Sequence, residues 1–256
     1  MALKPFALVL ALGMSALMPL AAQAAESVVL SAAALRLALA ERPPEGFQPG
    51  DSDKPTTFGT AGEMFNAAVS GAPFDVIILP PSRLEDLAKR HLIDAATIRP
   101  LGVMHLALAV RQGATAPDIS SETTFRDALA NATSVAIADP AQGATTGLYL
   151  AKLFDRLGLT ETLRPKLKLY ADGQAAMEAL AHGDVSIAIG QASEAAPVTG
   201  IDVVPNFPES LQLKTVYAAA IAARPVDRGM AERTMTRLTA PSFQDILKKQ
   251  GFTPAP

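Results

Sequence analysis

The side chains that most often carry covalent or metal chemistry are few and widely spaced in this chain. Cysteine is absent from all 256 residues, so the sequence provides no thiolate nucleophile, no disulfide and no cysteine for lipid attachment. The three histidines, His91, His105 and His182, stand far apart and show no spacing typical of metal ligands. We therefore expect no metal, no cofactor and no nucleophilic catalytic site.

The elements that must position any site follow a regular rhythm. Short runs rich in Val, Ile and Leu alternate with Ala-rich helical patterns, which is typical of β-α units that build a largely parallel sheet flanked by helices. The predicted strands are residues 28–31, 57–58, 75–79, 134–138, 168–171 and 185–190. The predicted helices are residues 33–41, 62–70, 81–90, 122–130, 147–157, 174–182, 227–238 and 241–250. A segment rich in Pro, Gly and Asp, residues 42–55, is predicted as a loop.

Two longer apolar runs, residues 103–110 and 215–222, are predicted as strands and begin about 110 residues apart. A chain that leaves one lobe and later returns to it needs two such crossover strands. The predicted boundaries are residues 25–107 plus 219–256 for lobe 1 and residues 108–218 for lobe 2.

The first 24 residues are typical of a secretory signal peptide. Lys4 supplies a positive start, residues 6–20 form a mainly apolar stretch, and Ala22-Gln23-Ala24 offers a small-x-small cleavage pattern. An apolar stretch of roughly 15 residues is too short for a membrane span, which needs about 20. We expect cleavage near Ala24 and a soluble protein in the periplasm.

Removal of the leader leaves 21 Lys plus Arg against 25 Asp plus Glu. This acidic balance argues against nucleic acid as a partner, and no later apolar run approaches the length of a membrane span. We expect a monomer that is not embedded in a membrane.

Several short motifs stand in a specific order along the chain. They are VVLSAAAL at 28–35, FGTAG at 58–62, GAPFDVII at 71–78, ADP at 138–140, GLYLAK at 147–152, AHGDV at 181–185, YAA at 217–219 and GF at 251–252. Their order and spacing resemble the periplasmic molybdate-binding proteins of ABC transporters. The resemblance covers essentially the whole mature chain and implies an α/β, two-lobed periplasmic binding protein type 2 fold, with the two crossover strands as its hinge. The wider relationship includes periplasmic aconitate isomerases.

The resemblance implies a ligand held between the lobes, in loops that lead from strand ends into helix starts. The first turn of a helix offers unpaired backbone N–H groups and the positive end of the helix dipole, so it can hold a small anion. Three loops qualify, at residues 31–34, 59–62 and 141–146. The expected ligand-binding residues are Ser31, Ala34, Arg36, Thr60, Ala61, Thr145, Thr146 and Gln191.

The chain departs from the family pattern at three ligand positions. Family members typically present serine hydroxyls where this chain has Ala34 and Ala61, and a tyrosine where it has Gln191. Nearby hydroxyls, at Ser31 and Thr60, could compensate. The smaller alanines and the guanidinium of Arg36, which pairs with carboxylates through two hydrogen bonds, suit a larger carboxylated molecule. Arg36 also fits a solvated position on an amphipathic helix.

The main hypothesis is a periplasmic solute-binding protein that closes around a small anion and delivers it to a membrane permease, with a hinge near Leu108 and Ala219. The alternative is a cofactor-independent isomerase of a tricarboxylate, similar to aconitate isomerase. Glu63 and Glu194 follow proposed ligand loops, so either could exchange a proton with a bound acid, although both also fit helix-start carboxylates. The sequence assigns no catalytic residue. A third hypothesis is a sensory module that presents its liganded form to a membrane receptor.

Overall fold

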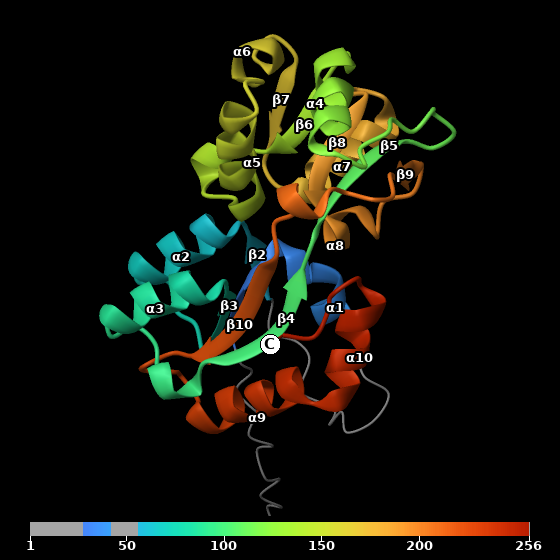
Figure 1. Cartoon of the computed structure of the whole chain (residues 1–256). Helices are drawn as coiled ribbons and strands as arrows, with labels where there is room; N and C mark the ends of the chain where they lie inside the picture. Colours follow the sequence, from blue (N-terminus) through green and yellow to red (C-terminus); the bar gives the residue numbers. More distant parts are fainter. Residues whose placement is uncertain (1–27, 42–55, 256) are drawn as a thin grey trace, which may run out of the picture.

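Figure 1 shows a computed structural model of the chain, which describes residues 28–41 and 56–255. The predicted leader and the predicted loop at 42–55 lie outside the described residues. No helix in the described part of the chain has the length and apolar character needed to cross a membrane.

The strands form two sheets, one in each lobe (Figure 1). The first sheet has the order β2 (Thr57–Gly59), β1 (Val29–Ala32), β3 (Val76–Leu79), β10 (Thr215–Ile221) and β4 (Arg99–Met104). The second has the order β7 (Leu167–Tyr170), β6 (Val135–Ala138), β8 (Ile187–Gln191), β5 (Leu106–Arg111) and β9 (Ile201–Val203). The two-lobed α/β architecture is therefore confirmed.

Each sheet is mixed. In the first, β1 pairs in parallel with β2 and β3, whereas β10 is antiparallel to both β3 and β4. In the second, β6 pairs in parallel with β7 and β8, whereas β5 is antiparallel to both β8 and β9. The strands of successive β-α units thus form the parallel pairs. The two strands that follow a crossover, β5 and β10, form the antiparallel pairs.

Helices cover both faces of each sheet. In lobe 1 they are the 3₁₀ turn η1 (Ala33–Leu35) continuing into α1 (Arg36–Ala40), then α2 (Ala61–Val69), α3 (Pro81–Lys89), η2 (Ala95–Thr97), α9 (Arg228–Thr239) and α10 (Pro241–Lys249). In lobe 2 they are α4 (Glu122–Asn131), η3 (Pro140–Gln142), α5 (Thr145–Arg156), α6 (Thr160–Leu163), α7 (Gly173–His182) and α8 (Ala192–Ala195), with η4 (Glu209–Leu211) on the return path. The short elements α6, α8 and β9 were not predicted, because none of them shows a full hydrophobic period.

Strand alternation places apolar side chains on both faces of the first sheet. Val29 and Ile78 pack with α1, α9 and α10, whereas Leu30 and Ile77 pack with α2 and α3. Figure 1 shows α2 and α3 on one side of this sheet and α1 and α10 on the other. Because the helices complete the core on both faces, the strand ends remain the open edge of each lobe.

The predicted single strand over residues 103–110 is two strands in different sheets. β4 ends at Met104 and β5 begins at Leu106, so the chain changes sheet at His105. His105 is the one polar residue of this run, and a single polar residue also occurs within continuous strands, so the sequence does not distinguish one strand from two.

The predicted lobe boundaries at 107/108 and 218/219 fall inside β5 and β10. The predicted hinge residues Leu108 and Ala219 are both fully buried within their sheets. The actual crossovers are His105 and residues 212–214. They are held together by Gln212, whose Oε1 accepts from the Leu106 N–H and whose Nε2 donates to the Leu106 carbonyl at 3.4 Å. The predicted hinge residues thus lie within the strands and not at the crossovers.

Candidate functional site

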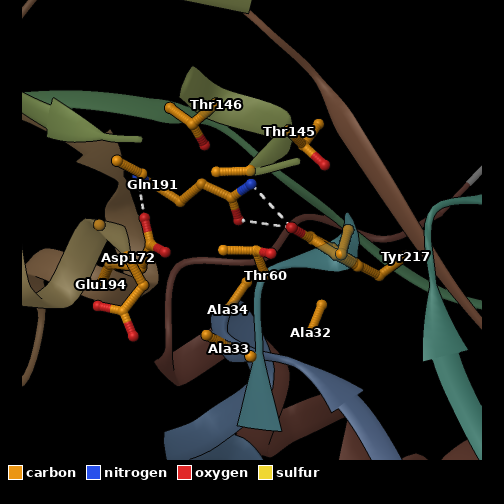
Figure 2. Close-up of a pocket in the computed structure, with 15 residues that line it drawn as sticks. Ala32, Ala33, Ala34, Thr60, Thr145, Thr146, Asp172, Gln191, Glu194 and Tyr217 are labelled. Carbon is orange, nitrogen blue, oxygen red and sulfur yellow. Dashed lines mark hydrogen bonds between the residues drawn. The ribbon is translucent and has the colours of Figure 1, made fainter. Parts of the chain in front are cut away.

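A pocket lies between the lobes, where strand ends from both sheets face each other (Figure 2). Lobe 1 contributes Ala32, Ala33, Ala34, Gly59, Thr60, Ala61 and Tyr217, and lobe 2 contributes Ala138, Ala144, Thr145, Thr146, Asp172, Gly173, Gln191 and Glu194. The cavity volume, taken as the space open to the centre of a water molecule, is about 20 Å³. That volume holds about one water. A larger ligand must part the lobes or displace side chains.

Six of the eight predicted ligand residues line this pocket, namely Ala34, Thr60, Ala61, Thr145, Thr146 and Gln191. Ser31 does not, because β1 extends through Ala32 and the serine lies inside the sheet. Its side chain is fully buried and its Oγ donates to the Ala32 carbonyl at 3.1 Å. Arg36 is also absent from the pocket wall. Whether the six residues bind a ligand remains a prediction.

Two helix starts at the pocket carry no side-chain cap. The residues that precede η1 and α5 are Ala32 and Ala144, and neither side chain accepts a hydrogen bond from the first turn. The predicted loop at 141–146 ends earlier than expected, so that Thr145 and Thr146 lie in the first turn of α5. Such uncapped turns offer backbone N–H donors to an anion.

The third helix start, that of α2, is capped from within its own lobe. Glu63 N–H donates to Thr60 Oγ1, and Thr60 N–H donates to Glu63 Oε2 at 2.7 Å, which forms a capping box. Glu63 is exposed, and it does not line the pocket. Both carboxylates proposed from the sequence belong to capping boxes, Glu63 at α2 and Glu194 at α8, but only Glu194 lines the pocket.

Lobe 1 and lobe 2 touch directly beside the pocket. Thr60 Oγ1 donates to the Gln142 carbonyl at 2.6 Å, and Gly62 N–H donates to the Gly143 carbonyl at 3.1 Å. Gly62 permits this approach, because a Cβ there would lie 2.6 Å from the Gly143 Cα. The structure is thus a closed form in which backbone meets backbone across the cleft.

Arg36 lies at the rim of the cleft. Its guanidinium stands 4.9 Å from the centroid of the Phe58 ring and 3.5 Å from Asp172 Oδ2 in the opposite lobe. Asp172 also caps α7 by accepting from the Ala175 N–H at 2.9 Å. Arg36 is thus part of a pair that spans the lobes, while its side chain at the start of α1 stays 39% exposed.

Gln191 and Tyr217 form a second polar contact between the lobes, inside the pocket (Figure 2). Gln191 Nε2 lies 2.8 Å and Oε1 3.1 Å from the Tyr217 hydroxyl, and both side chains are buried. Burial raises the pKa of Tyr217, so its hydroxyl stays protonated. Sequence reasoning did not assign Tyr217 to the site, although it is one of only three tyrosines and interrupts an apolar strand.

Glu194 supplies the carboxyl of the pocket wall. It accepts from the Gln191 N–H at 2.8 Å and is half-buried. Burial raises the pKa of Glu194 to about 7; the Gln191 and Gly173 N–H groups oppose this increase, as does Arg36, and nearby Asp172 adds to it. Such a carboxyl changes its charge near neutral pH and can donate or accept a proton there. Among the described residues no cluster of acidic or histidine side chains is suited to a metal.

Comparison with known proteins gives one family match, several similar binding proteins and a similar enzyme. Residues 27–253 match the model of a family described as bacterial extracellular solute-binding protein. An aconitate isomerase from a Pseudomonas species is 29% identical over 203 residues, which are 79% of this chain and 76% of that protein. The molybdate-binding protein ModA of Escherichia coli strain K12 is 26% identical over 204 residues, 78% of each chain. The periplasmic molybdate-binding protein of Azotobacter vinelandii shares the fold, with a TM-score of 0.72 at 18% identity, covering 90% of this chain and 100% of that one.

Proposed function

The chain belongs to the bacterial extracellular solute-binding protein family, and from that premise we propose that it is the periplasmic binding component of an ABC-type transporter. It captures a small carboxylate anion between its lobes and delivers it to a membrane permease. The observation that carries this proposal is the convergence of uncapped helix starts from both lobes on one pocket. Their N–H groups and dipoles attract an anion without a dedicated cation.

The hydroxyls around the pocket favour a carboxylate over a tetrahedral oxyanion. Ala34 and Ala61 offer none, and the neighbouring hydroxyls that could replace them are already engaged. Ser31 Oγ donates to its own strand, and Thr60 Oγ1 donates to the opposite lobe. A hydroxyl has a single proton to donate. An oxyanion ligand would therefore lack hydroxyl donors at the two positions where the resemblance leads one to expect serines.

Arg36, at the rim of the pocket, adds a cation to the helix starts. Its contact with Asp172 is long, at 3.5 Å, and the arginine side chain is 39% exposed. A ligand carboxylate that displaces Asp172 would exchange this long contact for the two-pronged hydrogen bonding that guanidinium groups form with carboxylates. The ligand would then touch both lobes, which is the condition for ligand-driven closure.

The ligand class is tested by melting the mature protein with molybdate, tungstate, methylphosphonate, citrate and the two aconitates. A ligand at 100 times its Kd adds about 2.7 kcal/mol to the free energy of unfolding, or roughly 5–10 °C for a chain of this size. We expect such an increase with at least one tricarboxylate and none with the metal oxyanions. Stabilisation by molybdate and tungstate alone would contradict the carboxylate assignment.

Glu194 supports a second candidate function, a tricarboxylate isomerase. Its carboxyl lines the pocket, has a pKa near neutral pH and belongs to a chain that is 29% identical to an aconitate isomerase. As a base it would take a proton from an allylic carbon of the bound acid and return it to the carbon across the double bond, with no cofactor. Proton transfer of this kind contributes roughly 10²- to 10⁴-fold to a rate.

Incubation with trans-aconitate, followed by chromatography of the cis isomer, separates the two functions. If the chain is an isomerase, Glu194→Gln lowers turnover at least about 100-fold. Glu63→Gln is the matched control, because glutamine also completes a capping box and the side chain lies outside the pocket. Binding of trans-aconitate with no turnover in the wild-type chain would exclude the isomerase and support transport.

A further inference from the structure

We propose that Glu194 couples ligand binding to proton uptake, so that the closing lobes take in the anion together with one proton held by this carboxyl. The inference rests on the proposed anion site and concerns its regulation. Glu194 lies on α8 in lobe 2 and lines the pocket beside Asp172 (Figure 2).

The position of the carboxyl is built into the backbone around it. Glycine at 173 leaves room for it, since a Cβ there would lie 1.9 Å from Glu194 Oε2. Glycine at 190 is close on another side, where a Cβ would lie 3.1 Å from the same oxygen. The Gln191 N–H holds that oxygen at 2.8 Å. These contacts hold the carboxyl at the pocket in this structure.

The charges that face Glu194 do not balance once a ligand is present. Asp172 faces it from the start of α7, Arg36 from α1 and the Tyr217 hydroxyl from β10. Arg36 is the one cation in this group, and it already faces Asp172. An incoming anion adds a further negative charge to a pocket that excludes all but about one water. Protonation of Glu194 removes one negative charge and turns its carboxyl into a hydrogen-bond donor.

The sign of the pH dependence follows. With its pKa at about 7 in the free chain, Glu194 is about half protonated at neutral pH. A bound anion raises the pKa further, so binding at pH 7 takes up about half a proton. Between this pKa and the higher pKa of the complex the uptake approaches one proton, and the affinity falls by up to about tenfold for each pH unit.

Isothermal titration calorimetry with trans-aconitate at pH 7, in two buffers of different ionisation enthalpy, measures the proton uptake directly. We expect about half a proton per ligand in the wild-type chain and none in Glu194→Gln. Glu63→Gln, a capping-box carboxylate outside the pocket in the other lobe, retains the wild-type uptake. Any proton taken up by the ligand itself appears equally in Glu194→Gln, so the difference between wild type and this variant reports Glu194 alone. Binding with equal proton uptake in wild type and Glu194→Gln would overturn the inference and leave the proposed function intact.

If none of the tested anions binds, the dependence of the melting temperature on pH tests the protonation of Glu194 without a ligand. Because the folded chain binds the proton more tightly than the unfolded one, the stability due to this group is present at acid pH and is lost as the pH rises through about 7. The melting temperature of the wild-type chain should therefore fall relative to Glu194→Gln between pH 5 and pH 8. Parallel melting curves over this range would overturn the inference. Asp172→Asn, which can still cap α7, should move the transition to lower pH.

Discussion

Gly62→Ala is expected to weaken ligand binding roughly 10- to 100-fold while leaving the fold intact. The added Cβ would lie 2.6 Å from the Gly143 Cα and 2.8 Å from the Gln142 carbonyl oxygen, both backbone atoms of the opposite lobe. Lobe 2 must therefore move away, with loss of the Gly62–Gly143 and Thr60–Gln142 hydrogen bonds. At about 0.5–1.5 kcal/mol each, these two bonds account for the expected factor.

We expect Gly62→Ala to keep its fold because the substitution lies inside a helix. Gly62 is the second residue of α2, where alanine is the better helix former by about 1 kcal/mol. Gly229→Ala is the matched control: Gly229 is the second residue of α9, and the nearest atoms to its added Cβ lie at 3.4 Å. We expect this control to bind like the wild type.

Two measurements check the prediction. The increase in melting temperature with a stabilising tricarboxylate should shrink in Gly62→Ala and persist in Gly229→Ala. Small-angle X-ray scattering should give a larger radius of gyration for Gly62→Ala alone, because its lobes are held apart. If both variants bind and scatter like the wild type, the contact between Gly62 and Gly143 is not part of the liganded state.

The fold was largely predictable because its signals are local. Val/Ile/Leu runs and Ala-rich helical periods mark β-α units within some 20 residues, and these units were placed correctly. The crossover at His105 was not, since the change from β4 to β5 depends on which sheet each half joins. The apolar residues on either side of His105 do not show which sheet each half joins.

The site was predictable where it depends on helix starts and unpredictable where it depends on the meeting of the lobes. The sequence predicts Thr145 and Thr146 at the site because they lie next to a helix start, and the first turn of a helix has N–H groups with no partner inside the helix. Asp172 and Tyr217 do not, because an aspartate before a helix is typical of a cap and a tyrosine in a strand is typical of a core. Asp172 is indeed a cap, and its second role against Arg36 exists only between closed lobes.

Asp75→Ala is expected to lower the free energy of unfolding by about 2–6 kcal/mol, the largest loss of stability from any single carboxylate of the described chain. The side chain is fully buried. Its Oδ2 accepts from the Val28 N–H at 2.7 Å and its Oδ1 accepts from the Val226 N–H at 2.6 Å. The carboxylate thus joins the start of β1, the start of β3 and the segment after β10. Alanine would leave two N–H groups without this acceptor, at about 1–3 kcal/mol each where water is excluded; because Val226 is 71% exposed, its N–H contributes at the low end of this range.

For a chain of this length such a loss lowers the melting temperature by roughly 5–20 °C, measured by circular dichroism. Asp75→Asn should fall between the wild type and Asp75→Ala, because its single carbonyl oxygen accepts one of the two N–H groups and its NH₂ opposes the other. Asp118→Ala is the control, since Asp118 is exposed and accepts from the Ser120 N–H within its own turn. Equal melting temperatures for Asp75→Ala and Asp118→Ala would mean that water reaches Val28 and Val226, and that the ends of β1 and β10 are held by their strand pairing alone.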